Sequence, residues 1–288
     1  MPPQGWGVDR SSAGSDGRRW RSRVWPVRLL SPALIALALA LGGCDVRFEQ
    51  EAEEALVSIC EPVIFEDTPL VQCTADPTQH SIATDLVPEG EETPYRSLRE
   101  LSFAERPDGA PPIVFAANGG MFDEEGFPIG YYVEDGQRLT VLNQRDGPGN
   151  FHMKPNGVFF GDSPSGPWQV LDTQRFASRG QRPHFATQSG PMLVVNGELH
   201  PDIQPNGTSL RIRNAVGVDE LGRAHFVMSE VPVSFGKLAR YYRDVLNVDN
   251  ALYLDGTVSQ IWDVPNDRLE TGPPIGPLIV VTMQEESS

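Results

Sequence analysis

The chain has 288 residues and a formal net charge of −16 at pH 7, with 39 acidic against 23 basic residues. This balance argues against nucleic acid as a partner, because phosphate-backbone binding needs a basic surface. It does not exclude a small anionic substrate, since bulk charge is screened over about 8 Å at physiological salt and a local arginine pair can still prevail.

The N-terminal segment has the pattern of an export signal. Six arginines lie within residues 1–28, and an apolar stretch from Leu29 to Leu41 leads into Gly42-Gly43-Cys44. These features predict a signal peptide over residues 1–43. The Leu-Gly-Gly-Cys ending resembles a bacterial lipobox, which implies cleavage before Cys44 and a lipid on its sulfur; an ordinary signal with an incidental cysteine is the alternative. We therefore expect an exported lipoprotein of the bacterial cell envelope, periplasmic or on the outer face, which contacts the membrane through Cys44.

The mature part is more acidic than the whole chain. Residues 1–43 hold six of the basic and two of the acidic residues, so 17 basic and 37 acidic residues remain, a net charge of −20. The acidic residues 44–56 predict a membrane-proximal tether, and residues 57–288 predict one domain. In an exported protein, Cys60 and Cys73 are expected to form a disulfide; two free buried thiols are the alternative. No zinc-ligand spacing occurs.

Alternating and apolar segments predict many strands and few helices. The helix expected over residues 94–105 has Ser97 and Glu100 at its start, and the hairpin after residues 130–134 turns at Asp135-Gly136. One long helix is expected from Ser234 to Leu246. Strands are expected at residues 57–65, 70–74, 80–87, 113–117, 130–134, 158–160, 168–171, 184–189, 192–195, 212–218, 225–229, 251–254, 258–262 and 277–283. Together these elements predict an α+β fold, a single domain with a mixed, largely antiparallel β-sheet.

The strand Ile113–Ala117 runs into a polar turn, Asn118-Gly-Gly-Met-Phe-Asp123. Gly119 and Gly120 allow positive φ or a close approach by a ligand or another backbone. A strand end that carries polar groups on such a turn is a common place for a site in α/β proteins. A tight turn in which Asn118 and Asp123 satisfy their own backbone is the alternative.

Other segments repeat this pattern of a strand joined to a polar, glycine-bearing turn. Arg211 and Arg213 share one face of a strand, and Asn214, at the other parity, is expected to face away unless a bulge intervenes. Ser189 lacks the glycine two residues before it that a nucleophile elbow requires. Turn capping and solvated salt bridges are the alternatives for these polar residues. The segments are Asn150-Phe-His152 with Lys154, Thr187-Gln188-Ser189-Gly190, and Leu254-Asp255-Gly-Thr-Val-Ser259.

Six collinear segments within about residues 80–284 resemble the phosphodiester glycosidase family. This family includes the lysosomal "uncovering" enzyme, an N-acetylglucosamine-1-phosphodiester alpha-N-acetylglucosaminidase, and bacterial exopolysaccharide-associated proteins, whose uncharacterised branch this chain resembles more. The segments are Ala117-Asn-Gly-Gly-Met-Phe-Asp, Pro128-Ile-Gly-Tyr-Tyr-Val-Glu, Gly149-Asn-Phe-His-Met-Lys-Pro-Asn-Gly-Val-Phe-Phe, Ala186-Thr-Gln-Ser-Gly-Pro-Met-Leu, Ile212-Arg-Asn-Ala-Val-Gly-Val-Asp and Asn250-Ala-Leu-Tyr-Leu-Asp-Gly.

The resemblance, together with the lipobox-like signal, implies a lipid-anchored hydrolase that cleaves a sugar-1-phosphodiester bond in cell-envelope glycans. A carboxylate must attack C1 or activate water, and Asp255 is the first choice, Asp123 the second and Glu230 the third. Arg211 or Arg213 would neutralise the phosphate. His152 would assist the leaving group or hold substrate, and Asn118 and Gln188 would bind sugar hydroxyls or the N-acetyl group. The other expected substrate-binding residues are Gly119, Gly120, Lys154, Ser189, Asn214 and Ser259.

One departure from the family pattern leaves a second function open. The glycosidase branch follows its Leu-Asp-Gly with Gly-Gly-Ser-Ser, whereas this chain has Leu254-Asp-Gly-Thr-Val-Ser-Gln. The alternative is a non-catalytic envelope lipoprotein that binds polysaccharide or an anionic glycan. No cofactor is expected; Ca²⁺ held by Asp123, Asp255 and carbonyl groups is the alternative, although no EF-hand-like spacing supports it.

Overall fold

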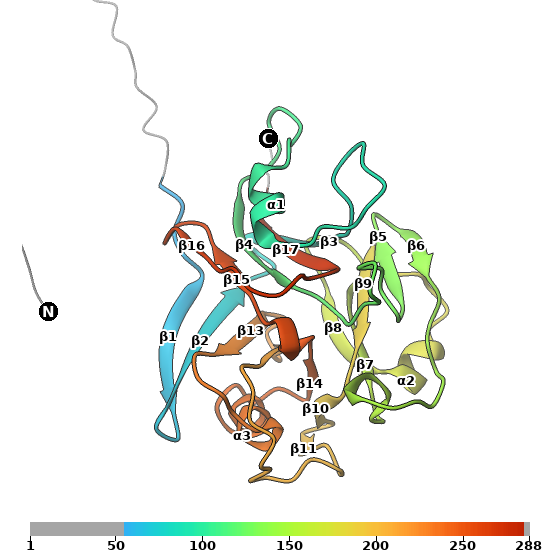
Figure 1. The fold of residues 1–288 in the computed structure, drawn as a ribbon, viewed down its shortest axis with the longest axis vertical. Coiled ribbons are helices and arrows are strands. Elements are labelled where there is room, and N and C mark those ends of the chain that lie inside the picture. The colour runs from blue at the N-terminus through green and yellow to red at the C-terminus, as the bar shows by residue number, and fades with distance from the viewer. Residues whose placement is uncertain (1–54, 285–288) are drawn as a thin grey trace, which may run out of the picture. The chain divides into compact units, whose positions relative to one another are not determined.

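A computed structural model describes residues 55–284; residues 1–54 and 285–288 fall outside this description. The predicted signal peptide, Cys44 and nearly all of the predicted tether therefore lie outside the described residues. Within residues 55–284 the chain forms a single compact domain of three β-sheets with three short α-helices (Figure 1). Each strand pairing in this part is antiparallel. The α+β, largely antiparallel prediction is confirmed.

The first sheet has seven strands in the order β1-β2-β13-β12-β14-β10-β11. Its central strands are largely buried on both faces, and apolar residues make up most of their sequence. The strands are β1 (Cys60–Phe65), β2 (Thr68–Ala75), β10 (Met192–Val195), β11 (Glu198–Leu199), β12 (Asn214–Val218), β13 (Ala224–Ser229) and β14 (Asn250–Tyr253).

The other two sheets have five strands each. The second has the order β16-β15-β4-β17-β3, with β3 (His80–Asp85), β4 (Ile113–Asn118), β15 (Ile261–Asp263), β16 (Arg268–Leu269) and β17 (Leu278–Met283). The third has the order β6-β5-β9-β7-β8, with β5 (Tyr132–Glu134), β6 (Gln137–Thr140), β7 (Gly157–Gly161), β8 (Trp168–Asp172) and β9 (Phe185–Ser189).

Helices are few and short, as the sequence predicts. In the first, the Ser97 hydroxyl accepts a hydrogen bond from the Glu100 backbone N–H, which is the expected helix start. The predicted long helix is present, but it changes from α-helix to a π-helical turn at Tyr241. Within residues 55–284, no helix is both long enough and apolar enough to cross a membrane. The helices are α1 (Leu98–Phe103), α2 (Thr173–Ala177) and α3 (Phe235–Arg240), with shorter turns η1 (Asn150–His152), η2 (Tyr241–Val245) and η3 (Gly256–Val258).

All three sheets contribute to one aromatic core. Phe115 of β4, Phe159 of β7 and Phe226 of β13 belong to the second, third and first sheets, and each is almost completely buried. The ring of Phe226 lies 5.2 Å from that of Phe115 and 5.9 Å from that of Phe159. Each such pair adds about 0.5–1.5 kcal/mol beyond the area it buries. The three sheets are thereby fixed relative to one another.

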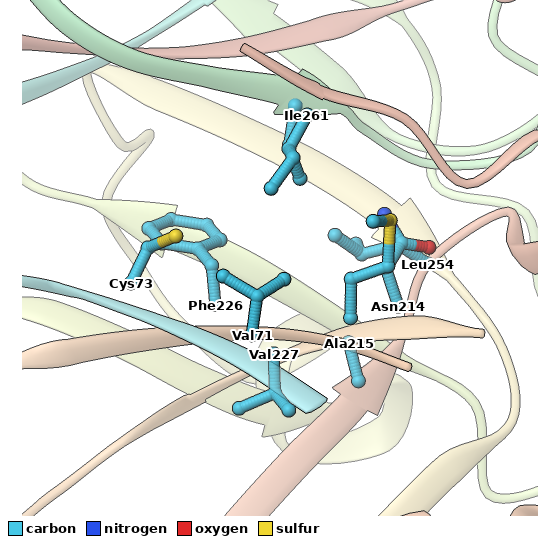
Figure 2. A pocket seen from close by; sticks show the side chains of 10 residues that line it. Val71, Cys73, Asn214, Ala215, Phe226, Val227, Leu254 and Ile261 are labelled. Carbon is cyan, nitrogen blue, oxygen red and sulfur yellow. The ribbon is translucent and has the colours of Figure 1, made fainter. Parts of the chain in front are cut away.

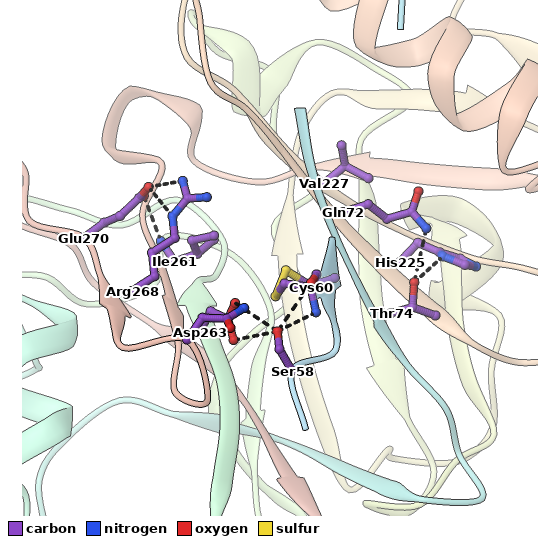
Figure 3. The surroundings of a disulfide bond; sticks show 12 residues. Ser58, Cys60, Gln72, Thr74, His225, Val227, Ile261, Asp263, Arg268 and Glu270 are labelled. Carbon is purple, nitrogen blue, oxygen red and sulfur yellow. Dashed lines mark hydrogen bonds and ion pairs between the residues drawn. A yellow bond between two sulfur atoms is a disulfide. The ribbon is translucent and has the colours of Figure 1, made fainter. Parts of the chain in front are cut away.

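Cys60 and Cys73, the two cysteines expected to pair, are joined by a disulfide with an S–S distance of 2.08 Å. They lie directly opposite each other on β1 and β2, so the bond closes the hairpin at the edge of the first sheet. Beside it, the Ser58 hydroxyl donates to the Asp263 carboxylate at 2.8 Å, which links the segment before β1 to the second sheet (Figure 3).

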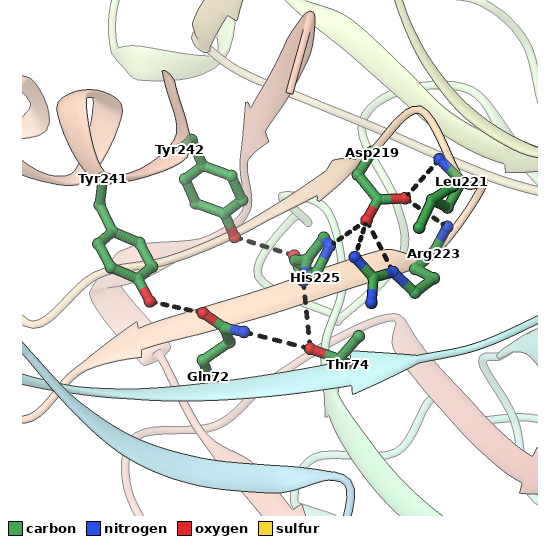
Figure 4. Close-up of polar contacts among 8 residues, drawn as sticks. All are labelled: Gln72, Thr74, Asp219, Leu221, Arg223, His225, Tyr241 and Tyr242. Carbon is green, nitrogen blue, oxygen red and sulfur yellow. Dashed lines mark hydrogen bonds and ion pairs between the residues drawn. The ribbon is translucent and has the colours of Figure 1, made fainter. Parts of the chain in front are cut away.

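A chain of polar contacts crosses the first sheet and reaches the π-helical turn (Figure 4). Tyr241 Oη donates to Gln72 Oε1 at 2.5 Å, and Gln72 Nε2 donates to Thr74 Oγ1 at 3.3 Å. The Thr74 hydroxyl lies 3.1 Å from Nδ1 of His225, whose Nε2 lies 3.0 Å from Asp219 Oδ2. Burial lowers the pKa of His225, so its ring is neutral at neutral pH and one nitrogen can accept from Thr74. These contacts tie β2, β13 and η2 together.

Two strand boundaries differ from the prediction for local reasons. The segment predicted as a strand over residues 258–262 begins in the turn η3, and β15 starts only at Ile261. The Asp255 carboxylate accepts a hydrogen bond from the Thr257 backbone N–H and so closes this turn. The strand predicted over residues 212–218 starts at Asn214, because the backbone of Arg211 pairs in an isolated bridge with Val233 instead.

Candidate functional site

The polar turns predicted from the sequence meet where strands of different sheets end. Asn118, at the end of β4, is the hub: its Nδ2 donates to the Asp255 carbonyl at 3.0 Å. Its Oδ1 accepts from Asn214 Nδ2 at 2.9 Å and from the Gln260 backbone N–H at 3.0 Å. The Asp255 backbone N–H donates to the Gly119 carbonyl at 3.3 Å. Segments far apart in sequence are therefore held within hydrogen-bonding distance.

Asn214 and Ser259 complete this cluster. The Ser259 hydroxyl lies 3.2 Å from Asn214 Oδ1 and 3.1 Å from the Gly256 carbonyl. Asn214 was expected to face away from the side of the strand that carries Arg211 and Arg213. The structure places Asn214 on the other face, as predicted from parity, but that face is the one that meets Asn118.

Of the two glycines after Asn118, Gly120 is required for space. A Cβ on Gly120 would overlap the carbonyl oxygen of Gln188, and the Gly120 N–H donates to Thr187 Oγ1 at 3.0 Å. The Gly119 N–H donates to the Pro277 carbonyl at 2.7 Å. Neither glycine has a positive φ. Of the two predicted reasons for glycine here, close approach of another backbone therefore applies.

Asp255 carries the ionisable group of the cluster. Its side chain is partly exposed, and its Oδ1 accepts from the Thr257 N–H at 3.2 Å. Burial raises the pKa of the Asp255 carboxyl, although the hydrogen bonds from Thr257 oppose the rise. A carboxylate whose pKa is shifted toward neutrality is suited to proton transfer near pH 7.

A closed apolar cavity lies behind the cluster, between the first and second sheets. Its volume is about 10 Å³, and Val71, Phe226, Leu254 and Ile261 form much of its wall (Figure 2). Asn214 also borders it, yet the amide of Asn214 makes its hydrogen bonds to Asn118 and Ser259. A space this small and this apolar does not favour an ordered water. It therefore backs the cluster and is not a ligand site.

The two arginines predicted to share a face lie in different environments. Arg213 is 1% exposed and donates to the carbonyl oxygens of Val233 and Ser209, each at 2.9 Å. Arg211 is exposed, and its side chain donates to the carbonyl of the neighbouring Leu210 at 2.8 Å. Arg213 thus uses its donors inside the protein while Arg211 faces solvent, and the role of Arg211 or Arg213 in neutralising a phosphate stays a prediction.

Gln188 and Ser189, predicted to bind substrate, are buried at the end of β9. Gln188 Oε1 accepts from the backbone N–H groups of Tyr131 and Asn143, and its Nε2 donates to the Asn143 carbonyl at 2.8 Å. These bonds hold the loop at residue 143 and leave the amide little capacity for a sugar. The Ser189 hydroxyl is enclosed, and no hydrogen-bond partner is found for it among residues 55–284.

Four further predicted residues make local contacts. Asp123 Oδ1 caps its own turn by accepting from the Phe127 N–H at 2.8 Å. The Glu230 carboxylate pairs with Arg268 at 2.8 Å. His152 Nδ1 lies 3.0 Å from the Arg145 carbonyl, and Lys154 forms an ion pair at 2.5 Å in the loop that precedes it. Whether any of them touches substrate stays a prediction.

The described residues contain no group of three or more histidine, cysteine, aspartate or glutamate side chains that could hold a metal ion. The Asp123 carboxylate accepts a hydrogen bond within its own turn. In the contacts described above, Asp255 lies next to carbonyl groups and not next to a second carboxylate. The Ca²⁺ alternative stays a prediction.

The sequence reasoning missed Tyr253 and Thr187. Tyr253 Oη receives a hydrogen bond from Arg213 Nη1 at 3.1 Å, and Thr187 holds the Gly120 backbone. A signal for Tyr253 was present, because residues two apart on a strand share a face and Tyr253 lies two before Asp255. No comparable signal marks Thr187, whose role depends on contact between two sheets.

Two partly buried carboxyl groups outside this cluster predict how stability depends on pH. Burial raises the pKa of Asp85 to about 6 and that of Glu134 to about 7; the charge of Asp135 adds to the rise at Asp85, and the charge of Asp85 adds to the rise at Glu134. Unfolding returns both to ordinary values, so the folded state binds more protons between about pH 4 and pH 7. Their contribution to stability should be full below pH 4 and should be lost as pH rises through 6 and 7.

The measurement is the midpoint of urea unfolding between pH 4.5 and pH 8. Glu134→Gln should flatten the decline of the midpoint over this range, because the amide cannot ionise. Glu124→Gln is the control, since Glu124 is exposed and no hydrogen bond to its side chain is found. An equally steep decline in Glu134→Gln and in the unaltered protein would contradict this assignment.

Comparisons with known proteins agree with this arrangement. Residues 112–281 match the family profile described as phosphodiester glycosidase, which is more than half of the chain. The uncharacterized protein YigE of Escherichia coli K12 is 41% identical over 150 residues, or 52% of this chain. The matching part spans 58% of the length of that relative.

Two solved structures share the fold. The catalytic domain of zebrafish N-acetylglucosamine-1-phosphodiester alpha-N-acetylglucosaminidase, auto-inhibited by its pro-peptide, has a TM-score of 0.52 and 17% identity over 81% of this chain and 85% of its own. A hypothetical protein from Synechocystis has a TM-score of 0.51 and 13% identity over 78% of this chain and 61% of its own. The matched segment contains Asn118, Asn214 and Asp255, which the strand ends bring together. The chain therefore belongs to the phosphodiester glycosidase family.

Proposed function

We propose that this protein hydrolyses a sugar-1-phosphodiester, with Asp255 as the carboxylate at the reacting carbon. Family membership indicates a glycosidase-type hydrolase. The observation that carries the finer proposal is the position of Asp255: it is a partly exposed carboxyl with a raised pKa, held at the meeting point of strand ends by the Asn118 amide. Asp123 and Glu230 are weaker candidates, since a turn and an ion pair already occupy their carboxylates.

The chemistry fits a single well-placed carboxylate. Cleavage breaks the C1–O bond, water supplies the hydroxyl that ends on C1, and the phosphate leaves with the bridging oxygen. A phosphate is a much weaker base than an alkoxide, so it needs little protonation and much neutralisation of charge. Asp255 would attack C1 or activate the water, and geometry alone does not select between these roles.

Arg211 is the arginine that suits the phosphate. Its guanidinium is exposed and forms no ion pair with any residue of the described range 55–284. A planar guanidinium can bind two phosphate oxygens at once. Arg213 lacks this freedom because its donors are bound to Val233, Ser209 and Tyr253.

Arg211→Ala tests this role. The purified protein would be given a panel of sugar-1-phosphodiesters, including one of N-acetylglucosamine, and the release of free sugar would be measured. We expect kcat/KM to fall about 10- to 100-fold, because a lost charge-assisted hydrogen bond is worth roughly 1.5–3 kcal/mol. Arg138→Ala is the control, since Arg138 is also exposed and lies on β6. Equal kcat/KM in Arg211→Ala and the unaltered protein would remove the phosphate role.

The cellular setting is proposed from the sequence. The lipobox-like Cys44 supports a lipid anchor in the bacterial envelope, and an anchored enzyme there would meet envelope glycans and their phosphodiester-linked groups. Mass spectrometry of the N-terminal peptide from membranes would reveal a diacylglyceryl group on Cys44. An intact, unlipidated Cys44 in the mature protein would contradict the anchor.

A second function is favoured by one observation, the filling of the turn after Asp255. Val258 is 7% exposed and belongs to the apolar cluster around Tyr95, Leu98 and Ile275. A buried valine in place of the family's glycine leaves less room for the close approach of a substrate. The alternative is therefore an envelope lipoprotein that binds an anionic glycan without cleaving it. Binding without sugar release across the panel would support this alternative.

A further inference from the structure

Arg213 is a buried cation without a carboxylate partner among residues 55–284. Its side chain donates to two carbonyl oxygens, to the Tyr253 hydroxyl and, at 3.4 Å, to the Ser209 hydroxyl, and none of the ion pairs in this range includes it. The ring of Phe235 covers one face, with its centroid 3.6 Å from the guanidinium carbon. Burying an unpaired charge costs free energy. Because no carboxylate among residues 55–284 pairs with Arg213, its electric field acts on the groups beside it.

Tyr253 stands between this cation and the turn that carries Asp255. Its ring packs edge-on against Phe235 at 4.6 Å, and the side chain is 2% exposed. The hydroxyl oxygen accepts from Arg213 Nη1 at 3.1 Å. A Cβ on Gly256 would overlap this same oxygen, so the hydroxyl lies directly beneath the Asp255-Gly256 backbone. The glycine of the Leu-Asp-Gly segment is thus explained by the tyrosine below it.

The hydrogen-bond arrangement gives the hydroxyl a direction. A phenolic oxygen that accepts from a guanidinium keeps its own hydrogen free to donate, and that hydrogen must point away from the guanidinium. Burial raises the pKa of Tyr253; the Arg213 guanidinium opposes this rise and the negative charge of Asp255 adds to it. The hydroxyl therefore stays neutral and keeps its hydrogen. The positive charge of Arg213 favours the ionised form of Asp255, and the Tyr253 hydroxyl contacts both Arg213 and the turn that carries Asp255.

We propose that Tyr253 is a positioning residue for Asp255, and that Arg213 acts on the reaction through Tyr253 and does not bind the phosphate itself. The inference rests on the proposed role of Asp255. The hydroxyl beneath Gly256 fixes the turn, and the Arg213–Tyr253 pair stabilises the carboxylate against the burial around it. Among residues 55–284, the groups of other elements that are hydrogen-bonded to this turn are uncharged and belong to Asn118, Gly119 and Asn214.

The variant Tyr253→Phe removes the hydroxyl and keeps the ring, so it tests the contribution of the hydroxyl alone. The aromatic contact with Phe235 is kept and the link between Arg213 and the turn is lost. We expect kcat to fall about 100-fold with little change in KM, because a small displacement of a catalytic group has an effect of this size. The acidic limb of the pH profile of kcat/KM should move to higher pH, since the turn is no longer fixed beside the Arg213 charge that favours the ionised form of Asp255. Arg213→Met should move the limb in the same direction.

A titration that needs no turnover keeps this inference separate from the proposed function. In protein labelled with ¹³C at aspartate carboxyl carbons, and assigned with Asp255→Asn, the pKa of Asp255 should rise in both Tyr253→Phe and Arg213→Met. Tyr241→Phe is the matched control, because it removes another buried hydroxyl, one that donates to Gln72. It should change neither the titration nor kcat.

The outcomes are distinct. An unchanged Asp255 titration and an unchanged kcat in Tyr253→Phe would overturn the positioning role and leave the proposed hydrolase intact. A shifted titration in a protein that cleaves no member of the panel would support the Arg213–Tyr253–Asp255 coupling and reject the hydrolase. A fall in kcat that is accompanied by an equal fall in Tyr241→Phe would show general loss of structure and would also overturn the positioning role.

Discussion

Asp255→Asn is expected to reduce the turnover of a cleavable sugar-1-phosphodiester by about 100-fold or more, the range found when a group that transfers protons or attacks carbon is lost. The amide keeps an oxygen that can accept from the Thr257 N–H, so the turn η3 should persist. Because burial raises the pKa of this carboxyl, an uncharged amide should be tolerated without loss of stability. Released sugar and the melting temperature would be measured on the same preparation.

The control for this variant is Asp244→Asn. Asp244 is a surface carboxylate paired with the neighbouring Arg243, so its loss should leave turnover unchanged. If Asp255→Asn released sugar at the rate of the unaltered protein, Asp255 would have no chemical role, and Asp123 would become the next carboxylate to replace.

Asn118→Ala is expected to give the largest loss of stability among the site variants, about 2–5 kcal/mol. The change removes the acceptor of both Asn214 Nδ2 and the Gln260 N–H, and an unsatisfied buried donor costs roughly 1–3 kcal/mol each. It also frees the Asp255 carbonyl, so the turn that carries the carboxylate should loosen. Urea unfolding would give the loss in stability, and sugar release below the melting temperature would give the loss in activity.

Asn206→Ala is the matched control, because Asn206 is exposed and no hydrogen bond to its side chain is found. Its unfolding free energy should stay within about 0.5 kcal/mol of the unaltered protein. Equal stability of Asn118→Ala and Asn206→Ala would contradict the hub described here. Asn118 would then be free to bind sugar hydroxyls, as the sequence first predicted.

Local patterns predicted the elements well wherever the cause of the structure was itself local. Ser97 caps its helix as expected, and both residues of the predicted turn Asp135-Gly136 have positive φ. The turn at Asn196-Gly197 behaves in the same way. The prediction over residues 258–262 failed because β-branched residues at 257 and 258 favour a strand, whereas the Asp255 side chain closes a turn there.

The site could be predicted only in part. Its turns were recognised, because a strand followed by glycines and polar residues is visible in the sequence. Their partners were not, since contacts such as Asn118 with Asn214 join residues 96 positions apart. The arginines show the same limit: Arg211 and Arg213 were expected on one face of a strand, but Arg211 pairs with Val233 in an isolated bridge and is exposed, whereas Arg213 is buried.

The meeting of strand ends from different sheets has a consequence for how this family can diversify. Asp255 is held by backbone contacts to Gly119 and by the amide of Asn118, and these contacts do not depend on which side chains follow at residues 257 and 258. Thr257 is exposed, so mutations there can change the surface next to the carboxylate while these contacts persist. Under the proposed role of Asp255, variation at this one position would change which substrates fit before it changed the chemistry.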